Sequence, residues 1–209
     1  MPFDGPECPA VSALANIHQS ICGVGAARET ISKADRKQIN DVVFRLMGLS
    51  DSEQYLIEDF VRIHFLMIKG KVEKDAVRTP KNQELSSYLR TLRDQLDEYM
   101  EDEAEPASHH ITAVVDHRTA MIEIVLRAGK PAHPVLKQAD ETEVAELAKT
   151  RARLLKKHHQ WIYFDRNLKL YSNGRVYLFK PLQRVQWTRR QAILDADELI
   201  AEVLGSSDD

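Results

Sequence analysis

Residues 110–126, HITAVVDHRTAMIEIVL, decide the fold class. Both halves of this stretch are rich in Ile, Val and Thr, and such residues favour strands. Three polar residues, Asp116, His117 and Arg118, separate the two apolar runs. Two strand-like runs joined by a short polar turn predict a β-hairpin.

A second hairpin is predicted closer to the C-terminus. Leu168–Tyr171 and Val176–Phe179 are strand-like, and Asn173-Gly174 lies between them. Asn-Gly favours the tight turns that join antiparallel strands. Trp161–Phe164 is also strand-like and precedes this unit.

Helical periodicity surrounds both hairpins. Apolar residues recur at helical spacing over 34–47, in the segment after Ser50 and over about 83–103. Gly48 predicts the end of the first of these helices, and Ser50 with Glu53 predicts a capping box for the second. Two further helices are expected: one over about 140–159, and one that Thr188 with Gln191 opens as a capping box and that includes Ile193 to Leu204.

We therefore expect an α+β protein in which a helical N-terminal part precedes a small mixed part with two β-hairpins and two helices. The expected divisions are a poorly patterned segment over 1–30, a helical domain over 31–105 and an α+β domain over 106–209 that carries the basic hairpin. A secretory leader, a membrane-spanning apolar run and a cysteine metal motif are not recognisable in the sequence. We expect a cytoplasmic protein without cofactor or membrane partner; the pattern leaves its oligomeric state open.

The charge distribution gives the strongest functional signal. Residues 151–190 hold eleven Lys and Arg but one acid, Asp165, whereas the whole chain has a net charge of −3. Aromatic residues interleave with these cations, so the segment does not have the composition of a disordered tail. A folded positive face indicates a polyanionic partner, and DNA is the first to consider. An acidic surface elsewhere in the assembly is the alternative.

We predict phosphate contacts by cations of this segment, because guanidinium and ammonium groups bind phosphates and aromatic rings stack on bases. The predicted nucleic-acid-binding residues are Lys156, Lys157, Arg166, Lys169, Arg175, Lys180, Arg184, Arg189 and Arg190, with Tyr171 and Trp187 as stacking residues. The competing interpretation is that the rings face the core and that the arginines cover apolar surface.

Catalytic motifs are mostly missing. The sequence has no Walker-type loop, no Gly-x-Ser-x-Gly elbow and no His-Glu-x-x-His pair. Asp116 and Glu123, with His117, suggest a metal-dependent nuclease as a weaker alternative. The lysine that such a site needs shortly after its second carboxylate is absent. We therefore expect no catalytic residues and no bound metal.

Two stretches resemble a known family. Residues 36–61, RKQINDVVFRLMGLSDSEQYLIEDFV, resemble C-terminal helical segments of bacterial adenine-specific DNA methyltransferases of restriction–modification systems. Residues 161–204, WIYFDRNLKLYSNGRVYLFKPLQRVQWTRRQAILDADELIAEVL, are similar to C-terminal regions of proteins encoded with or fused to such enzymes in defence loci. The family's Asn/Asp-Pro-Pro-aromatic loop has no counterpart, since this sequence contains no Pro-Pro. The resemblance therefore implies a companion protein rather than a complete methyltransferase.

Together these observations predict a non-catalytic, DNA-associated accessory subunit of a bacterial restriction–modification or antiphage defence complex. Its expected partners are DNA and a methyltransferase, helicase or nuclease subunit of the same system. One alternative is a protein–protein interaction module that bridges defence subunits without touching DNA. The other is the metal-dependent nuclease.

Overall fold

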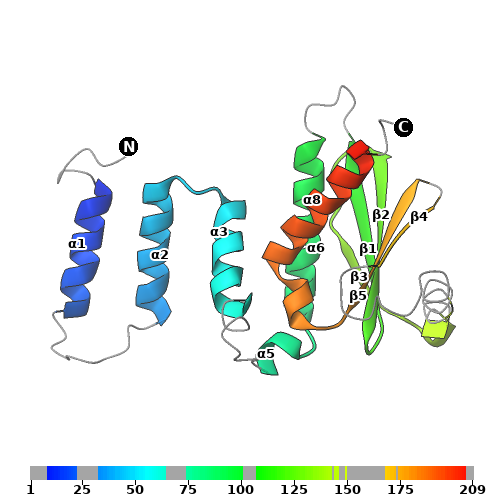
Figure 1. The fold of residues 1–209 in the computed structure, drawn as a ribbon, viewed down its shortest axis with the longest axis horizontal. Coiled ribbons are helices and arrows are strands. Elements are labelled where there is room, and N and C mark those ends of the chain that lie inside the picture. Colours follow the sequence, from blue (N-terminus) through cyan, green and yellow to red (C-terminus); the bar gives the residue numbers. More distant parts are fainter. Residues whose placement is uncertain are drawn as a thin grey trace. The chain divides into compact units, whose positions relative to one another are not determined.

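The computed structural model describes residues 9–22, 33–64, 74–100, 107–142, 144–145, 149, 168–172 and 174–205. The fold is α+β, as expected: its helices accompany one mixed five-stranded sheet (Figure 1). The helices are α1 (Pro9–Cys22), α2 (Lys33–Met47), α3 (Asp51–Asp59), the π-helical turn η1 (Phe60–His64), α5 (Lys74–Val77), α6 (Asn82–Tyr99), the 3-10 turn η2 (Arg184–Trp187) and α8 (Arg189–Gly205). The strands are β1 (Ala107–Val115), β2 (Thr119–Ala128), β3 (Val135–Gln138), β4 (Leu168–Ser172) and β5 (Arg175–Pro181).

The chain forms two compact units, residues 1–57 and 58–209. In the first unit, α1 packs with α2, and α2 ends at Gly48, whose φ of 66° suits glycine. The predicted capping box follows: the Ser50 N–H donates to Glu53 Oε2 at 2.8 Å, and the Glu53 N–H donates to Ser50 Oγ at 3.3 Å. Both local sequence signals are confirmed here.

The second unit contains the sheet, whose strands lie in the order β3-β1-β2-β5-β4. Both predicted hairpins are present: β1 pairs antiparallel with β2, and β4 pairs antiparallel with β5. β2 also pairs with β5, which joins the hairpins into one sheet. β3 is an unpredicted edge strand, parallel to β1 and only four residues long. Such a short run offers too little alternation for a sequence pattern to reveal it.

One face of the sheet packs on α6 and α8, which lie side by side (Figure 1). The stripe predicted for the third helix forms this core, with Tyr88 and Leu92 fully buried. The register aligns Ile111, Ile124 and Val176 in one row, and Ala113, Ile122 and Leu178 in the next. Alternate strand residues share a face, so these rows all point toward the helices.

The unit boundary differs from the expected one near residue 105. The helix expected over about 83–103 belongs to the helical part in that division, but the structure packs its apolar stripe, now on α6, against the sheet and α8. The short helix α5 precedes α6 in this unit, and its Ala76 is buried. Most of the helix expected over 140–159, and the strand-like Trp161–Phe164, lie outside the described residues.

Candidate functional site: the predicted basic face

The predicted DNA-binding residues divide into two groups. Lys156, Lys157 and Arg166 lie outside the described residues. The others fall on β4, β5, η2 and α8. On β5 the register places Lys180 opposite Ala120, on the side that faces the helices, whereas Arg175 points to the opposite side. Even within one strand, the cations do not share a face.

Lys180 lies in the core, where only 1% of it is exposed. Its ammonium forms an ion pair with Asp195 of α8 and donates to the Tyr88 hydroxyl at 3.0 Å. The Tyr88 hydroxyl in turn donates to Asp195 Oδ2 at 2.5 Å. The other Asp195 oxygen accepts a hydrogen bond from Gln191 Nε2 at 2.9 Å. This buried cluster therefore connects β5, α6 and α8.

Burial and the negative charge of Asp195 act in opposite directions on the pKa of the Lys180 amine. Burial lowers the pKa of Lys180 to about 8, against the opposing attraction of Asp195. Burial also raises the pKa of the Tyr88 hydroxyl well above its ordinary value, with Asp195 contributing in the same direction. The ammonium lies 4.2 Å from the centre of the Tyr88 ring, a cation–π distance. Each group has its partners inside the fold.

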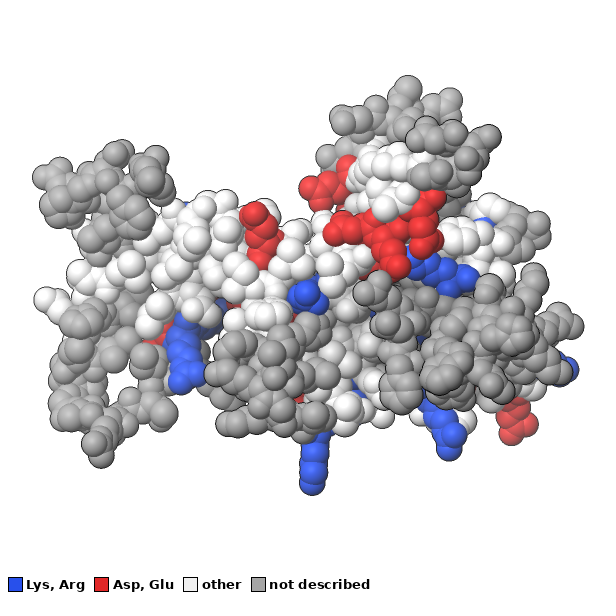
Figure 2. All heavy atoms as spheres, in the orientation of Figure 1, with Lys and Arg blue, Asp and Glu red and all other residues white. Residues whose placement is uncertain are grey.

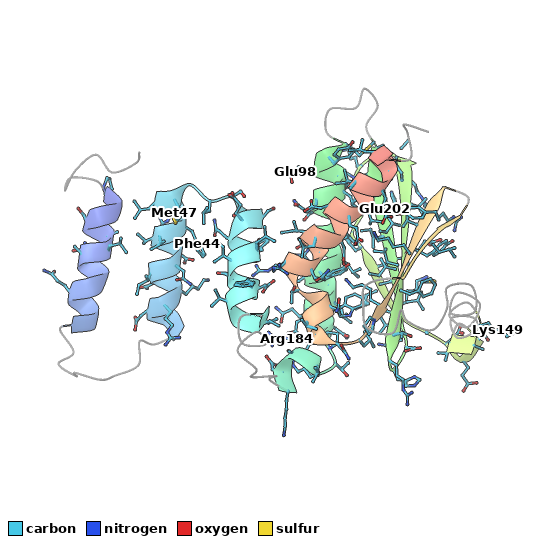
Figure 3. All side chains as sticks on the ribbon, viewed as in Figure 1. Phe44, Met47, Glu98, Lys149, Arg184 and Glu202 are labelled. Atoms are coloured by element: carbon cyan, nitrogen blue, oxygen red, sulfur yellow. The ribbon has the colours of Figure 1, made fainter. Side chains whose placement is uncertain are left out.

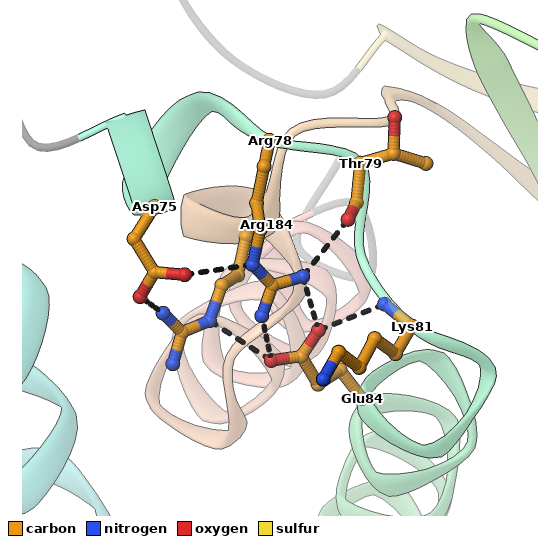
Figure 4. Close-up of polar contacts among 6 residues, drawn as sticks. All are labelled: Asp75, Arg78, Thr79, Lys81, Glu84 and Arg184. Atoms are coloured by element: carbon orange, nitrogen blue, oxygen red, sulfur yellow. Dashed lines mark hydrogen bonds and ion pairs between the residues drawn. The ribbon is translucent and has the colours of Figure 1, made fainter.

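Arg184 is also buried, with 4% exposed. Its guanidinium forms ion pairs with Asp75 of α5 and, at 2.9 Å, with Glu84 of α6 (Figure 4). Arg78 binds the same two carboxylates: it donates to both Glu84 oxygens, at 2.8 and 2.6 Å, and to Asp75 at 2.7 Å. The backbone N–H of Arg184 donates to the Arg78 carbonyl at 2.9 Å. Two arginines and two carboxylates thus join η2 to α5 and the start of α6.

Trp187 is an internal residue rather than a stacking platform for bases. It is 2% exposed, and its ring meets Tyr88 edge-on, with centroids 4.9 Å apart. Its indole N–H donates to the Pro181 carbonyl at 2.9 Å. The expectation that Lys180, Arg184 and Trp187 are available to DNA is therefore wrong, because all three side chains are enclosed by the protein.

The remaining described residues of the predicted face also bind groups of this chain. Lys169 lies 2.6 Å from Glu202 and 3.2 Å from Glu198, and Tyr171 donates a hydrogen bond to Glu202. Figure 3 shows Glu202 on α8, beside the strands. The Arg175 guanidinium forms a 2.6 Å ion pair with Glu123, which also accepts a hydrogen bond from Tyr177.

The two arginines that open α8 have partners as well. Arg189 forms a 3.0 Å ion pair with Glu58. The Arg190 guanidinium lies 5.9 Å from the centre of the Phe60 ring, and its backbone N–H donates to Asp59 Oδ2 at 3.1 Å. These contacts join α8 to the segment where α3 ends and η1 begins.

The two carboxylates of the nuclease alternative lie apart on the β1–β2 hairpin. Asp116 accepts hydrogen bonds from the backbone N–H groups of Arg118 and Thr119, both at 2.6 Å, and so shapes the β1–β2 turn. These bonds lower its pKa despite partial burial, which acts in the opposite direction. Glu123 lies opposite Thr112, four residues along β1 from Asp116, or roughly 13 Å at strand spacing. Within the described ranges, no group of three or more His, Cys, Asp or Glu residues is placed to hold a metal ion.

The acidic partners of these cations were not predicted from the sequence. They are Glu58, Asp75, Glu84, Glu123, Asp195, Glu198 and Glu202. One signal was available: the residues from Gln191 onward carry six acids and no base, directly after the basic segment. Opposite charges in adjacent segments are consistent with mutual neutralisation as well as with an external polyanion.

No helix among the described residues has the length and apolar character to cross a membrane. Comparisons of this chain with protein families, with curated proteins and with solved structures found no match.

Proposed function

We propose that this chain is a non-catalytic protein-interaction subunit that bridges other proteins. In this proposal its β4–β5 hairpin does not contact DNA. One observation carries the proposal: each of the six described cations of the basic segment already binds a carboxylate or an aromatic ring of the same chain. A phosphate would have to displace those partners. The electrostatic gain that drives DNA binding is correspondingly reduced.

The surface around the end of α8 supports a protein partner. Val203 and Leu204 are about half exposed, as is Tyr171 of the neighbouring β4. Figure 2 shows acidic side chains gathered over α8, with basic ones beside them. Exposed apolar and aromatic groups bordered by charges are typical of protein interfaces rather than of DNA-binding surfaces. We call Tyr171, Glu198, Glu202, Val203 and Leu204 the α8 surface.

The resemblance to companions of adenine-specific DNA methyltransferases suggests the class of partner. We propose a methyltransferase, helicase or nuclease subunit of a restriction–modification or antiphage defence complex. In this proposal the chain itself performs no chemistry. Its acidic helix and apolar end supply the contacts, and the partner supplies any contact with DNA.

Co-purification with the neighbouring gene products tests this proposal. After DNA in the sample has been digested with an added nuclease, the full chain should co-elute stoichiometrically with a methyltransferase, helicase or nuclease subunit of the system. We expect Val203→Asp with Leu204→Asp to weaken that complex at least about tenfold, because two charges replace buried apolar contacts at the interface. The matched control is Val135→Asp, on the far edge of the sheet and comparably exposed. A complex that falls apart when DNA is digested would contradict the proposal.

A further inference from the structure

Among the described strands, β4 forms the edge of the sheet that lies beside the α8 surface. β4 is the last strand in the order, and no described strand pairs with its outer side. Alternate residues of such a strand direct N–H and C=O groups away from the sheet, where another chain can pair with them. Edge strands are usually guarded by charged side chains, lysine above all.

The lysine on this strand does not guard its edge. The Lys169 ammonium is turned onto α8, where Glu198 and Glu202 bind it, and only 10% of its side chain is exposed. Tyr171, on the same side of the strand, is likewise held against Glu202 and remains 49% exposed. β4 thus presents its backbone edge together with an aromatic ring, a useful cross-strand contact.

We propose that β4 accepts an extended segment of a protein partner as a sixth strand, and that this segment carries Lys or Arg at alternate positions. The proposal rests on the proposed function, because it specifies how the α8 surface holds its partner. Strand addition of this kind takes affinity from backbone hydrogen bonds and specificity from alternate side chains.

Charge selects the occupant. On the helix-facing side, the next strand would place alternate side chains beside Glu198 and Glu202, whose side chains are 41% and 43% exposed. Lys169 supplies one positive charge against these two carboxylates, and α8 contains no base after Arg190. Basic residues at alternate positions of the partner strand would neutralise the remaining negative charge of Glu198 and Glu202.

A second copy of this chain fits the edge less well. Antiparallel pairing of two β4 strands across a two-fold axis makes a continuous sheet, with both α8 helices on the same face. The acidic residues of both copies would then approach one another. Like charges at an interface lower affinity, so a basic heterologous strand is favoured.

Synthetic peptides test the proposal on the full chain by isothermal titration calorimetry. The first peptide has nine residues in which Lys alternates with Val, and the second has Glu in place of Lys. Two variants of the Lys peptide carry backbone N-methyl groups on alternate residues. Each variant blocks the N–H groups along one of the two edges of the extended peptide. We expect the Lys peptide to bind, the Glu peptide not to bind, and only one N-methylated copy to lose affinity, because strand addition uses one edge.

Glu198→Lys should weaken binding of the Lys peptide about three- to tenfold, because it removes one partly exposed attraction and puts a like charge in its place. This change leaves the Lys169–Glu202 pair in place. Glu141→Lys, an equal charge change at an exposed residue outside the α8 surface, should leave the affinity unchanged. Equal binding of the Lys and Glu peptides, or of both N-methylated copies, would overturn the proposal. So would a dimer that must dissociate before the peptide binds. These results involve no DNA and no neighbouring gene product, so they are separable from a failure of the proposed function.

Discussion

Replacing Asp195 with alanine is expected to lower the free energy of unfolding of the unit formed by residues 58–209 by about 3–5 kcal/mol. The substitution leaves the Lys180 ammonium buried without its counter-ion, and it removes the acceptor of the Tyr88 hydroxyl. An unpaired charge in the core costs far more than the net contribution of the pair itself. Urea unfolding followed by tryptophan fluorescence measures the effect, since Trp187 packs on Tyr88.

Two further variants isolate the cause. Lys180→Met combined with Asp195→Leu should recover the part of the loss that the unpaired charge causes, because apolar side chains of similar volume replace both charges. The Tyr88 hydroxyl still lacks its acceptor in this variant, so that part of the loss should remain. Glu202→Ala removes an exposed partner of Lys169 and should cost less than about 1 kcal/mol. If Asp195→Ala costs no more than Glu202→Ala, the buried pair does not hold α8 on the sheet as we describe.

Replacing Glu84 with alanine is expected to be the second most damaging change, at about 2–4 kcal/mol. This carboxylate binds Arg78 and the buried Arg184, and it accepts the backbone N–H of Lys81 at the start of α6. Its loss is less severe than that of Asp195 because Asp75 remains paired with Arg184 and Glu84 is partly exposed. Urea unfolding again gives the magnitude.

Glu84→Gln separates charge from hydrogen bonding, because the amide oxygen still accepts from Lys81 while the negative charge is gone. We expect the free energy of unfolding of Glu84→Gln to lie between that of the wild type and that of Glu84→Ala. Glu98→Ala, an exposed position on the same helix, should change stability by less than about 0.5 kcal/mol. If Glu84→Gln is as stable as the wild type, the negative charge of Glu84 contributes nothing to stability beyond its hydrogen bonds.

Local signals in the sequence predicted much of the fold. Both hairpins, the helix over 34–47 and its glycine end follow from patterns within about ten residues. The Thr188 and Gln191 pair at the start of α8 is likewise local: the Gln191 N–H donates to Thr188 Oγ1 at 3.0 Å. Such features depend on neighbouring side chains and backbone preference, which a sequence displays directly.

The candidate site was far less predictable, because its partners are distant in the chain. Arg189 pairs with Glu58, and Arg184 pairs with Asp75, each across more than a hundred residues. Only the tertiary fold brings these charges together. One nearer signal existed: on β5, Lys180 alternates in step with Val176 and Leu178, which places it on the apolar side of the strand.

We propose that the described cations of the β4–β5 hairpin stabilise this fold and do not bind DNA. Arg175 gives the most direct test, because its side chain is exposed on β5 and its partner Glu123 can be removed separately. Fluorescence anisotropy with a labelled DNA duplex, at salt concentrations from about 50 to 200 mM, measures the DNA affinity. It also gives the slope of the logarithm of that affinity against the logarithm of the salt concentration. We predict that Arg175→Ala and Glu123→Gln leave both unchanged from the wild type. A slope that falls by about one unit in Arg175→Ala, together with tighter binding in Glu123→Gln, would contradict the account.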